Sequence, residues 1–439
     1  MAILAQQSFF NYETDLSDYG DLERLLMLLE VLPDETLIER LERQRGSRGR
    51  DKYPVAVMWN CVLAGIIFQH PTYESLKREL ARNAQLRLVV SGGRMTSLTV
   101  PPHYAMSRFL KNLMNCQDEI DAMFIAMVDT LSTMLPQFGQ DVAIDSKYIK
   151  SYAKSLRDKR KAGARAEHDA NWGVKEYSGR REDGSFWKKT ESFFGFKIHL
   201  LVDSNHELPV AYSMTKANRS DMAEAPVLLE HYKACNPMVY DQAKTLQGDR
   251  GYDKQGFVEM LANDGIKAVI DTRHLWKEAK KPLLHYDNVL YNEKGEVFCA
   301  CPKTGKERTM PNNGYESSRD CIRKSCPTAV RIGLYCEGAA LCACHHGLRI
   351  PRQTDPRAFQ RIPRDSHVWQ RLYNKRTSVE RVNSRLDVSF GFENHTIRGM
   401  KKMQLRCSLA LLVMNTLAYA HLLCKADSTT YRSLIRIPA

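Results

Sequence analysis

Apolar positions in the first third of the chain recur with the period of an α-helix. In the first such stretch they fall on one face, at Leu22, Leu25, Leu26 and Leu29. A second stretch begins at Pro54, and a loop containing Gly and Pro precedes a basic amphipathic segment that ends at Leu113. This layout is compatible with a helix-turn-helix reader of DNA, although spacing alone does not establish one. We predict an N-terminal all-α domain over residues 1–138 that binds DNA or serves assembly.

From Asp141 the period changes to two, as in a strand with one buried face. A hairpin of two strands follows, then a helix capped by Ser220 or Asp221 and a short strand that ends at Asp249. Another helix and another strand complete the series. This order predicts a mixed α/β core over residues 139–271.

The regular pattern stops after residue 271, and a region rich in Cys, Pro and Gly occupies residues 272–365. Helical spacing returns over residues 366–439 and aligns four apolar side chains, Leu372, Val379, Val382 and Leu386. The apolar run Cys407–Cys424 is interrupted by Asn415 and His421, which favours a buried core helix over a membrane span. We therefore predict a Cys-rich insertion, followed by C-terminal helices that return to the core.

Composition, charge and the amino-terminal sequence indicate a binding partner and a cellular compartment. The 439 residues are 43% hydrophobic, which suffices for two or three folded domains. A formal net charge of +13 favours a polyanion such as nucleic acid, although many basic proteins never bind one. The linker that contains Arg48 and Arg50 could lie along a phosphate backbone or be a solvated connection. The amino terminus resembles neither a secretory signal nor a transit peptide, so we expect a cytoplasmic protein without a membrane partner.

Three acidic residues are candidates for chemistry. Asp145 follows an apolar strand, Asp249 ends another, and Glu380 lies within a helical segment. Carboxylates brought together in this way suit Mg²⁺, which prefers hard oxygen ligands, and without a cation they would repel one another. Each acid taken singly is explained as well by a cap or an ion pair. Periodicity alone does not make them a triad.

A resemblance joins the three acids. The segments concerned are, in order, VAIDSKYI, DANWGVK, FFGFKIHLLVD, ELPVAYSMTKANRSD, GDRGYD and RTSVERVNSRL. Together they resemble the catalytic domain of bacterial insertion-sequence DDE transposases, which belong to the RNase H-like superfamily. The block from YPVAVMWNCVLAGIIF to FLKNL is similar to the helical domain that precedes it in that group. The resemblance implies an RNase H-like mixed sheet flanked by helices, an N-terminal all-α domain and a tendency to carry an insertion. We expect that insertion to be the Cys-rich region and to contain β-strands.

The resemblance also implies site residues. Asp145, Asp249 and Glu380 match the catalytic acids, which would hold Mg²⁺ or Mn²⁺, with two ions in the usual mechanism. Many relatives carry Tyr, Arg, Glu and Lys at fixed intervals. Here Tyr373, Arg376 and Glu380 fit, but position 387 is Asp. The basic contact to a phosphate would then come from Arg381 or Arg385, and for Arg381 an ion pair on a solvated helix face is an equal alternative.

The implied function is that of a transposase. It would bind double-stranded DNA at the ends of its element, cleave a strand and join the freed 3′ end to target DNA, as a homodimer or a larger synaptic complex. Two alternatives stay open: an RNase H-like nuclease or domesticated DNA-binding relative that performs no strand transfer, and a zinc-containing nucleic-acid-binding protein without catalysis.

Seven cysteines lie between Cys299 and Cys344, followed by His345 and His346. In a reducing compartment such a cluster indicates metal binding rather than disulfides, and a tetrahedral Zn²⁺ site would help a small polar region to fold. The four ligands we predict are Cys301, Cys321, Cys326 and Cys344. The alternative is a set of reduced, partly buried cysteines.

Several other residues are weaker candidates. His199 could reach a phosphate, but a structural role in the sheet is favoured. Tyr252 could stack on a base or fill the turn between strand and helix. The tryptophans could hold a base flipped out of the duplex, although each is explained more simply by packing. They are Trp172, Trp187, Trp276 and Trp369.

Overall fold

The N-terminal part of the protein is helical, as the spacing of apolar residues predicts. The computed structural model describes residues 20–45, 53–92, 100–155, 166–181, 185–273 and 275–424. The first helices are α1 (Asp21–Val31), α2 (Glu35–Arg45), α3 (Val55–Ile67), α4 (Tyr73–Arg82), α5 (Ala84–Val90), α6 (His103–Leu113) and α7 (Gln117–Met134). Trp59 at their centre is fully buried, and its Nε1 donates to Asp34 Oδ2 at 2.7 Å. This bond ties α3 to the turn between α1 and α2.

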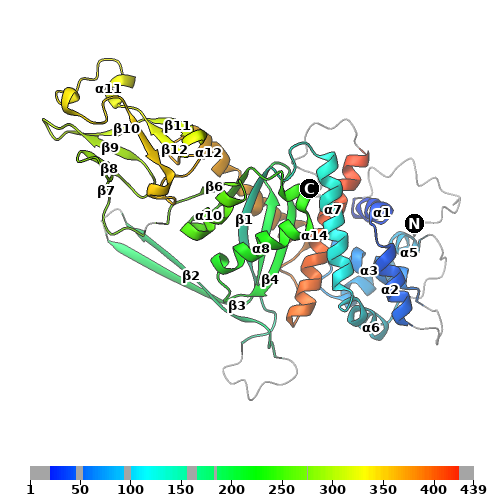
Figure 1. The fold of residues 1–439 in the computed structure, drawn as a ribbon. Helices are drawn as coiled ribbons and strands as arrows, with labels where there is room; N and C mark the ends of the chain where they lie inside the picture. The colour runs from blue at the N-terminus through cyan, green and yellow to red at the C-terminus, as the bar shows by residue number, and fades with distance from the viewer. Residues whose placement is uncertain are drawn as a thin grey trace.

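A six-stranded mixed sheet forms the middle of the molecule (Figure 1). Its strands are β1 (Asp141–Lys150), β2 (Asn171–Arg180), β3 (Phe186–Asp203), β4 (Leu208–Lys216), β5 (Thr245–Gly248) and β6 (Lys267–Ile270). β3 pairs antiparallel with β1, β2 and β4, whereas β5 runs parallel to β1 and β6 parallel to β5. The predicted mixed α/β core is confirmed.

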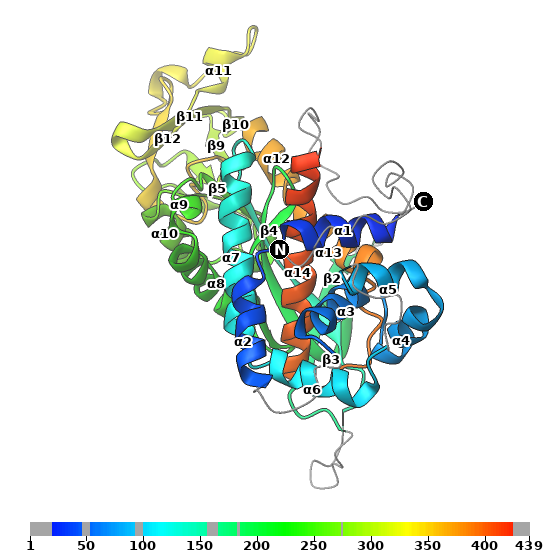
Figure 2. The same cartoon turned by 90° about the vertical axis from the view of Figure 1, so that its right-hand side faces the viewer.

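Helices cover the sheet because their apolar faces match its buried strands. Between β4 and β6 lie α8 (Asp221–Cys235), α9 (Pro237–Tyr240), the 3₁₀ turn η3 (Arg250–Tyr252) and α10 (Gln255–Asn263), and the last helices are α12 (His367–Asn374), α13 (Thr377–Phe390) and α14 (Met400–Cys424). α8 packs on β3 and β4, and α13 packs on β1 and β3. α14 runs beside α7 and joins the sheet to the N-terminal helices (Figure 2).

The apolar helix α14 lies inside the protein. Among the described residues Met400–Leu423 is long and apolar enough to cross a membrane by length and composition, but 78% of its apolar window is buried in the fold. Its core residues include Leu411, Val413 and Met414, none of which is exposed. The helix is therefore accounted for by packing against α7, as the sequence favours.

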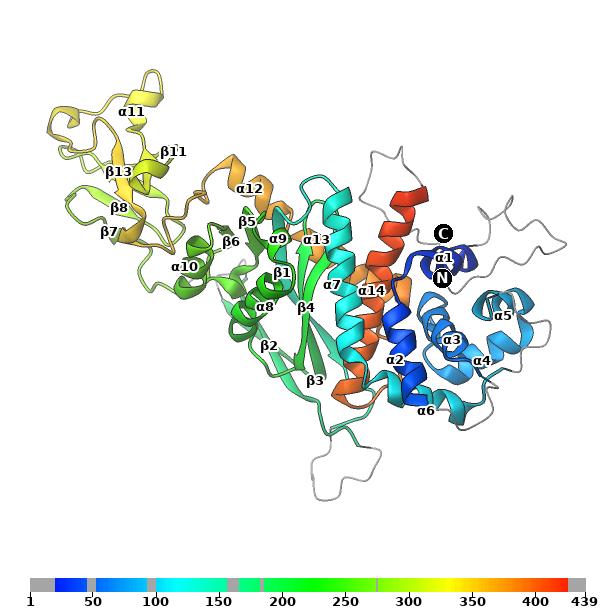
Figure 3. The same cartoon turned by 45° about the vertical axis from the view of Figure 1, so that its right-hand side comes forward.

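The Cys-rich region forms two small sheets that project from the core on the side away from the N-terminal helices (Figures 1 and 3). The elements are β7 (Lys281–Pro282), β8 (Val289–Tyr291), β9 (Val297–Ala300), β10 (Glu307–Met310), β11 (Asn312–Glu316), η4 (Ser317–Arg319), β12 (Cys321–Lys324), α11 (Pro327–Val330), η5 (Ala339–Leu341), β13 (Leu348–Pro351) and η6 (Arg352–Thr354). Buried ion pairs attach it to the core, since Arg357 lies 2.6 Å from both Asp253 and Glu293. The predicted β-containing insertion is confirmed.

The hairpin of β2 and β3 extends beyond the rest of the sheet (Figure 1). The second half of β3 lies between β1 and β4 and is buried, whereas its first half pairs with β2 alone and is exposed. Trp172 is 49% exposed and Phe186 is 77% exposed on this arm.

Candidate active site

The register between β1 and β5 aligns two of the three candidate acids. Asp141 pairs with Thr245 and Ala143 pairs with Gln247, so the parallel register is offset by 104 residues, by subtraction. Asp145 and Asp249 are also 104 residues apart. Continuing the register therefore sets Asp249 beside Asp145, across neighbouring strands that lie about 4.8 Å apart. The backbone pairing of the sheet thus brings the two carboxylates together.

Asp249 ends β5 and begins the short turn that follows it. Its Oδ1 accepts a hydrogen bond from the Gly251 backbone N–H at 2.8 Å, so the carboxylate caps η3. A Cβ at Gly251 would lie 2.8 Å from the same oxygen, which makes glycine the fitting residue there. Tyr252 is only 2% exposed and packs behind the turn, so it fills this turn rather than offering a stacking surface for a base.

Asp145 is largely enclosed. Its Oδ1 accepts from the Ser146 backbone N–H at 2.7 Å. The pKa of Asp145 is raised to about 6, mainly by burial; the negative charge of Asp249 contributes to the increase, whereas the hydrogen bond from Ser146 and the Arg376 guanidinium oppose it. Ionisation of Asp145 is costly beside another acid, and a bound cation would favour the ionised form.

Glu380 approaches the site from α13, in the company of Arg376. The helix is held on the sheet by Val379, Val382 and Leu386, which are fully buried. The Glu380 side chain is 53% exposed, and its Oε1 lies 2.9 Å from Arg376 Nη2. The Arg376 guanidinium is near enough to act electrostatically on both Asp145 and Glu380.

The aromatic residues before α13 support Arg376. The rings of Trp369 and Tyr373 stack with centroids 4.6 Å apart, and the Arg376 guanidinium lies 5.8 Å from the centre of the Tyr373 ring. Trp369 is 6% exposed, so in this structure it packs and is not free to hold a flipped base.

The oxygen donors suit a hard cation, although the side chains are not gathered tightly around one point. In the described part of the chain, no three side chains among His, Cys, Asp and Glu come close enough together to hold a metal ion. Asp145 and Asp249 are neighbours through the sheet, while Glu380 is turned toward Arg376. The donor chemistry fits Mg²⁺, which prefers carboxylate oxygens.

A lysine that the sequence analysis passed over lies next to this site. Lys147 is on the same face of β1 as Asp145, two residues along. Its Nζ lies 2.8 Å from Asp387 Oδ2 and 3.0 Å from Glu393 Oε1. Burial alone would lower the pKa of Lys147, but hydrogen bonds to these two carboxylates raise it above its usual value. The unexpected Asp387 is therefore the partner of the Lys147 ammonium group on β1. The signal in the sequence was that Lys147 follows Asp145 by two residues on a strand, which sets both side chains on one face.

The arginines offered as replacements for the missing lysine have different environments. Arg385 is 9% exposed, and its guanidinium donates to the Glu207 carbonyl at 2.6 Å and to Glu207 Oε2 at 2.8 Å. It therefore fastens α13 to the turn between β3 and β4 and is not available to a phosphate. Arg381 also contacts Glu207, but its side chain is 56% exposed. Arg48 and Arg50 lie outside the described residues.

His199 has a structural setting, as the sequence favours. It is 2% exposed, its Nε2 is 2.9 Å from Thr215 Oγ1, and its Nδ1 is 3.6 Å from Asp221 Oδ1. Burial lowers the pKa of His199 to about 4. The neighbouring Lys197, also buried, donates to Asp221 at 2.9 Å. These side chains hold the start of α8 against β3.

The remaining tryptophans differ in exposure. Trp172 and Trp187, both on the β2–β3 arm, are 49% and 37% exposed, so they are accessible to a partner. Trp276 packs edge-to-face on Tyr291 with ring centroids 5.4 Å apart. Packing therefore accounts for Trp276, the tryptophan of the insertion.

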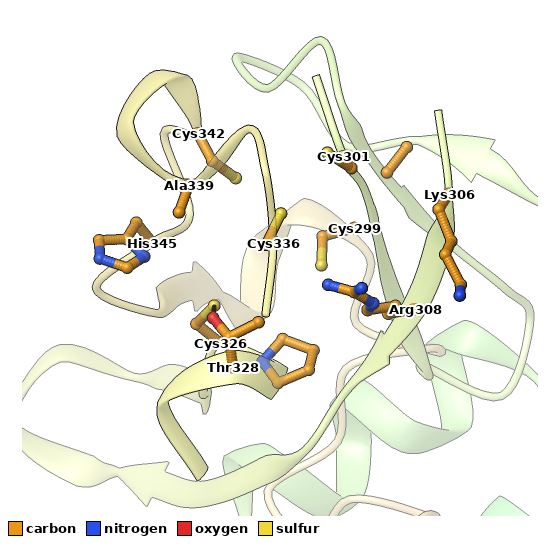
Figure 4. Close-up of a pocket in the computed structure, with 12 residues that line it drawn as sticks. Cys299, Cys301, Lys306, Arg308, Cys326, Thr328, Cys336, Ala339, Cys342 and His345 are labelled. Carbon is orange, nitrogen blue, oxygen red and sulfur yellow. Dashed lines mark hydrogen bonds between the residues drawn. The ribbon is translucent and has the colours of Figure 1, made fainter. Parts of the chain in front are cut away.

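Five cysteines of the insertion line one small cavity of about 20 Å³, namely Cys299, Cys301, Cys326, Cys336 and Cys342 (Figure 4). Cys344 is fully buried beside them, with its Sγ 3.1 Å from that of Cys342. A hydrogen bond from the Cys344 thiol lowers the pKa of Cys299 to about 7. Of the four predicted zinc ligands, Cys301 and Cys326 line the cavity, whereas Cys321 and Cys344 do not. The Cys321 thiol donates to the Arg319 carbonyl at 3.1 Å.

Comparison with known proteins identifies a protein family for this chain. The family model described as "Transposase DDE domain" matches residues 136–416, which include all three candidate acids and the whole insertion. No curated protein matches the sequence. A cryo-EM structure of the piggyBac transposase synaptic complex with hairpin DNA is similar over 95% of this chain and 79% of that chain, at 11% identity and a TM-score of 0.36. At that TM-score the likeness carries no argument about the site.

Proposed function

Because the chain belongs to the transposase DDE domain family, we propose that it is a DNA transposase whose catalytic acids are Asp145, Asp249 and Glu380. In this proposal it binds the double-stranded ends of its element, cleaves a strand and transfers the freed 3′-hydroxyl to target DNA. The supporting observation is the register of β1 and β5, whose offset equals the spacing of the first two acids. Because two ends must be cut and joined together, we propose a homodimer or a larger synaptic complex.

The three carboxylates would hold Mg²⁺ or Mn²⁺, as two ions in the family's usual arrangement. When bound, such ions lower the pKa of an attacking water and neutralise charge on the phosphate oxygens. The protein itself contributes by positioning the carboxylates and a guanidinium group. The sheet fixes two acids, and α13 delivers the third with Arg376, whose guanidinium can meet the charge that develops on the phosphate.

Lys147 supplies the basic contact that the sequence lacks at position 387. An ammonium group has three N–H donors, so the bonds to Asp387 and Glu393 leave one for a phosphate oxygen. Asp387 then orients Lys147, and the positive charge reaches the site from β1 instead of from α13. Arg381, which is exposed on the same helix, is the second candidate for contact with DNA.

An excision assay tests the proposal. A plasmid carries a marker between the two DNA segments that flank this gene in its genome, and excision and reinsertion are scored in the presence of Mg²⁺. Asp145→Asn and Asp249→Asn should each reduce excision by at least about 1,000-fold, because loss of a metal-holding carboxylate removes charge stabilisation in the transition state. The matched control is Asp241→Asn, an exposed acid at the opposite end of the same strand region.

The products separate the alternatives. Joined products in the wild type establish strand transfer, whereas cleavage without joining would identify a nuclease of the same fold. Wild-type levels of excision by Asp145→Asn would overturn the assignment of the triad.

A further inference from the structure

One segment of the insertion is held without an apolar core of its own. Between residues 328 and 347 the only buried residues are Gly338 and Cys344. The large apolar side chains of this segment face solvent instead: Val330 is 55% exposed, Tyr335 is 75% exposed and Leu341 is 70% exposed. Only Cys344 of this segment belongs to the buried apolar cluster of the insertion, with Cys342 packed against it, so the hydrophobic effect contributes little to fixing the segment on the two small sheets. Some other interaction has to hold it.

The side chains that do point inward are thiols. Cys342 and Cys344 come from this segment, and they meet Cys299 on β9: the sulfur atoms of Cys342 and Cys344 are 3.1 Å apart, and the Cys344 thiol is hydrogen-bonded to Cys299. A second contact joins Cys336 to Cys301, again between the segment and the end of β9. Figure 4 shows four of these side chains, those of Cys299, Cys301, Cys336 and Cys342, around a shared space.

The backbone approaches closely enough for a cross-link. A Cβ at Gly338 would lie 2.8 Å from Pro302 and 3.0 Å from the Cys301 sulfur, so the loop between Cys336 and Cys342 is pressed against the strand end. A reduced thiol is a weak hydrogen-bond donor, and several of them would not order a loop of this length. Thiolates bound to one soft cation would do so.

We propose that Cys299, Cys342 and Cys344 bind one structural Zn²⁺ ion, with the fourth thiolate supplied by Cys301 or Cys336. This set replaces Cys321 and Cys326 of the sequence-based prediction. With Zn–S distances of about 2.3 Å, tetrahedral geometry requires sulfurs about 3.8 Å apart. In the described side-chain positions no three of these thiols surround a common point, so binding of the ion requires some of them to rotate. Cys342 and Cys344 would also have to separate by about 0.7 Å from their present contact. The ion would fasten the exposed segment to β9.

Zinc content of the full-length protein tests this proposal without DNA or activity. Protein purified without chelator should contain about one zinc per chain by plasma mass spectrometry. Cys299→Ser and Cys344→Ser should each lower that content at least about tenfold, because each removes one of four ligands. Cys321→Ser is the matched control: it is a buried cysteine of the same insertion whose thiol contacts a backbone carbonyl, so it should keep its zinc.

A second measurement guards against variants that fail to fold. In the wild-type protein, titration of thiols with a mercurial should release zinc in step with about four thiols, detected with a coloured chelator. Single substitutions of Cys301 and Cys336 then identify the fourth ligand. Zinc-free wild-type protein would overturn the proposal, as would equal loss of zinc in Cys321→Ser or a disulfide between Cys342 and Cys344 in protein kept under reductant. None of these results depends on the assignment of Asp145, Asp249 and Glu380.

Discussion

The α/β core and the Cys-rich insertion position their candidate site residues by different means. In the core, Asp145 and Asp249 are aligned by the hydrogen-bonded register of two parallel strands, which are themselves covered by buried helices. In the insertion, the segment that carries Cys342 and Cys344 places only Cys344 in the buried apolar cluster, and its thiols lie near those of Cys299 and Cys301 at the end of β9. The core therefore relies on backbone pairing and packing, whereas the insertion relies on the chemistry of a few side chains.

This difference determines which changes each region tolerates. A register is sensitive to the number of residues in a strand, because a slip of one residue turns every following side chain to the other face. A cross-linked loop is sensitive to the identity of its cross-linking residues and much less to its length. The predictions below test that contrast.

The largest effect is expected from adding one residue to a strand of the core. An alanine inserted between Gly248 and Asp249 moves the carboxylate by about 3.3 Å and rotates it away from Asp145. Since a misplacement of about 1 Å can cost about 100-fold in rate, excision should fall by at least about 1,000-fold. The matched insertion after Gly333, in the exposed segment of the Cys-rich region, should leave excision within about threefold of wild type. Equal losses in both variants would contradict the contrast drawn between the regions.

Deletion of an apolar side chain should separate the regions by stability. Leu386 is fully buried under α13, so Leu386→Ala should lower the free energy of unfolding by about 2–5 kcal/mol. Leu341, which is 70% exposed in the insertion, should change it by less than about 0.5 kcal/mol when it is replaced by Ala. Denaturant titration followed by circular dichroism provides the comparison. A large loss in Leu341→Ala would reveal a packing role that its exposure does not predict.

Exchange of charges tests the role given to Lys147. Lys147→Ala should reduce excision by about 10–100-fold, because a phosphate contact and the partner of Asp387 are both lost. The double variant with Lys147→Asp and Asp387→Lys returns the positive charge to α13 and should recover activity to within about tenfold of wild type. Lys244→Ala, an exposed lysine at the far end of the sheet, is the control. If the exchange fails to recover activity although the variant folds, the ion pair does not act through its positive charge.

The smallest effect concerns the pH dependence of stability. The pKa of Asp145 rises from 3.8 to about 6 on folding, mainly through burial. The folded protein then binds the proton more tightly than the unfolded chain, so the free energy of unfolding decreases as the pH rises from about 4 to about 6 and is level above that range. Asp145→Asn removes the ionisation and should stabilise metal-free protein at pH 8 by about 1–3 kcal/mol, or a few degrees in Tm.

Thermal unfolding in EDTA measures this difference, which should vanish below about pH 4. Asp241→Asn, at an exposed acid, should show no such dependence. A difference between Asp145→Asn and wild type that is the same at pH 4 and pH 8 would contradict the assigned pKa.

Much of the fold follows from local patterns. The helical spacing of leucines in α1 and the alternation in β1 each depend on which face of a single element is buried. That face can be recognised from residues that are close together in the sequence. The boundary of the core at β1 and the change to a Cys-rich region after β6 were visible for the same reason. The length of β3 was not, because its exposed half is ordered only by pairing with β2.

The candidate site was only partly visible. Asp249 directly follows β5, as the sequence predicts, whereas Asp145 lies in the middle of β1 because that strand continues to Lys150. The resemblance around RTSVER singled out Glu380. The pairing of Lys147 with Asp387 joins residues that are 240 positions apart, by subtraction. Similarly, burial of Arg385 against Glu207 excludes it as a phosphate contact, and nothing in the local sequence distinguishes it from the exposed Arg381.

By itself, the sequence determined the mixed α/β class, the helical region before it and the Cys-rich insertion, and through resemblance it predicted the three acids. Only the tertiary structure decided which partners those residues meet. Strand register converts a spacing of 104 residues into neighbouring carboxylates, helix packing gives Asp387 its lysine, and the course of one exposed loop selects which thiols face one another. The reason is physical: periodicity reports the burial of one face of an element, whereas contacts between distant segments depend on how the elements pack.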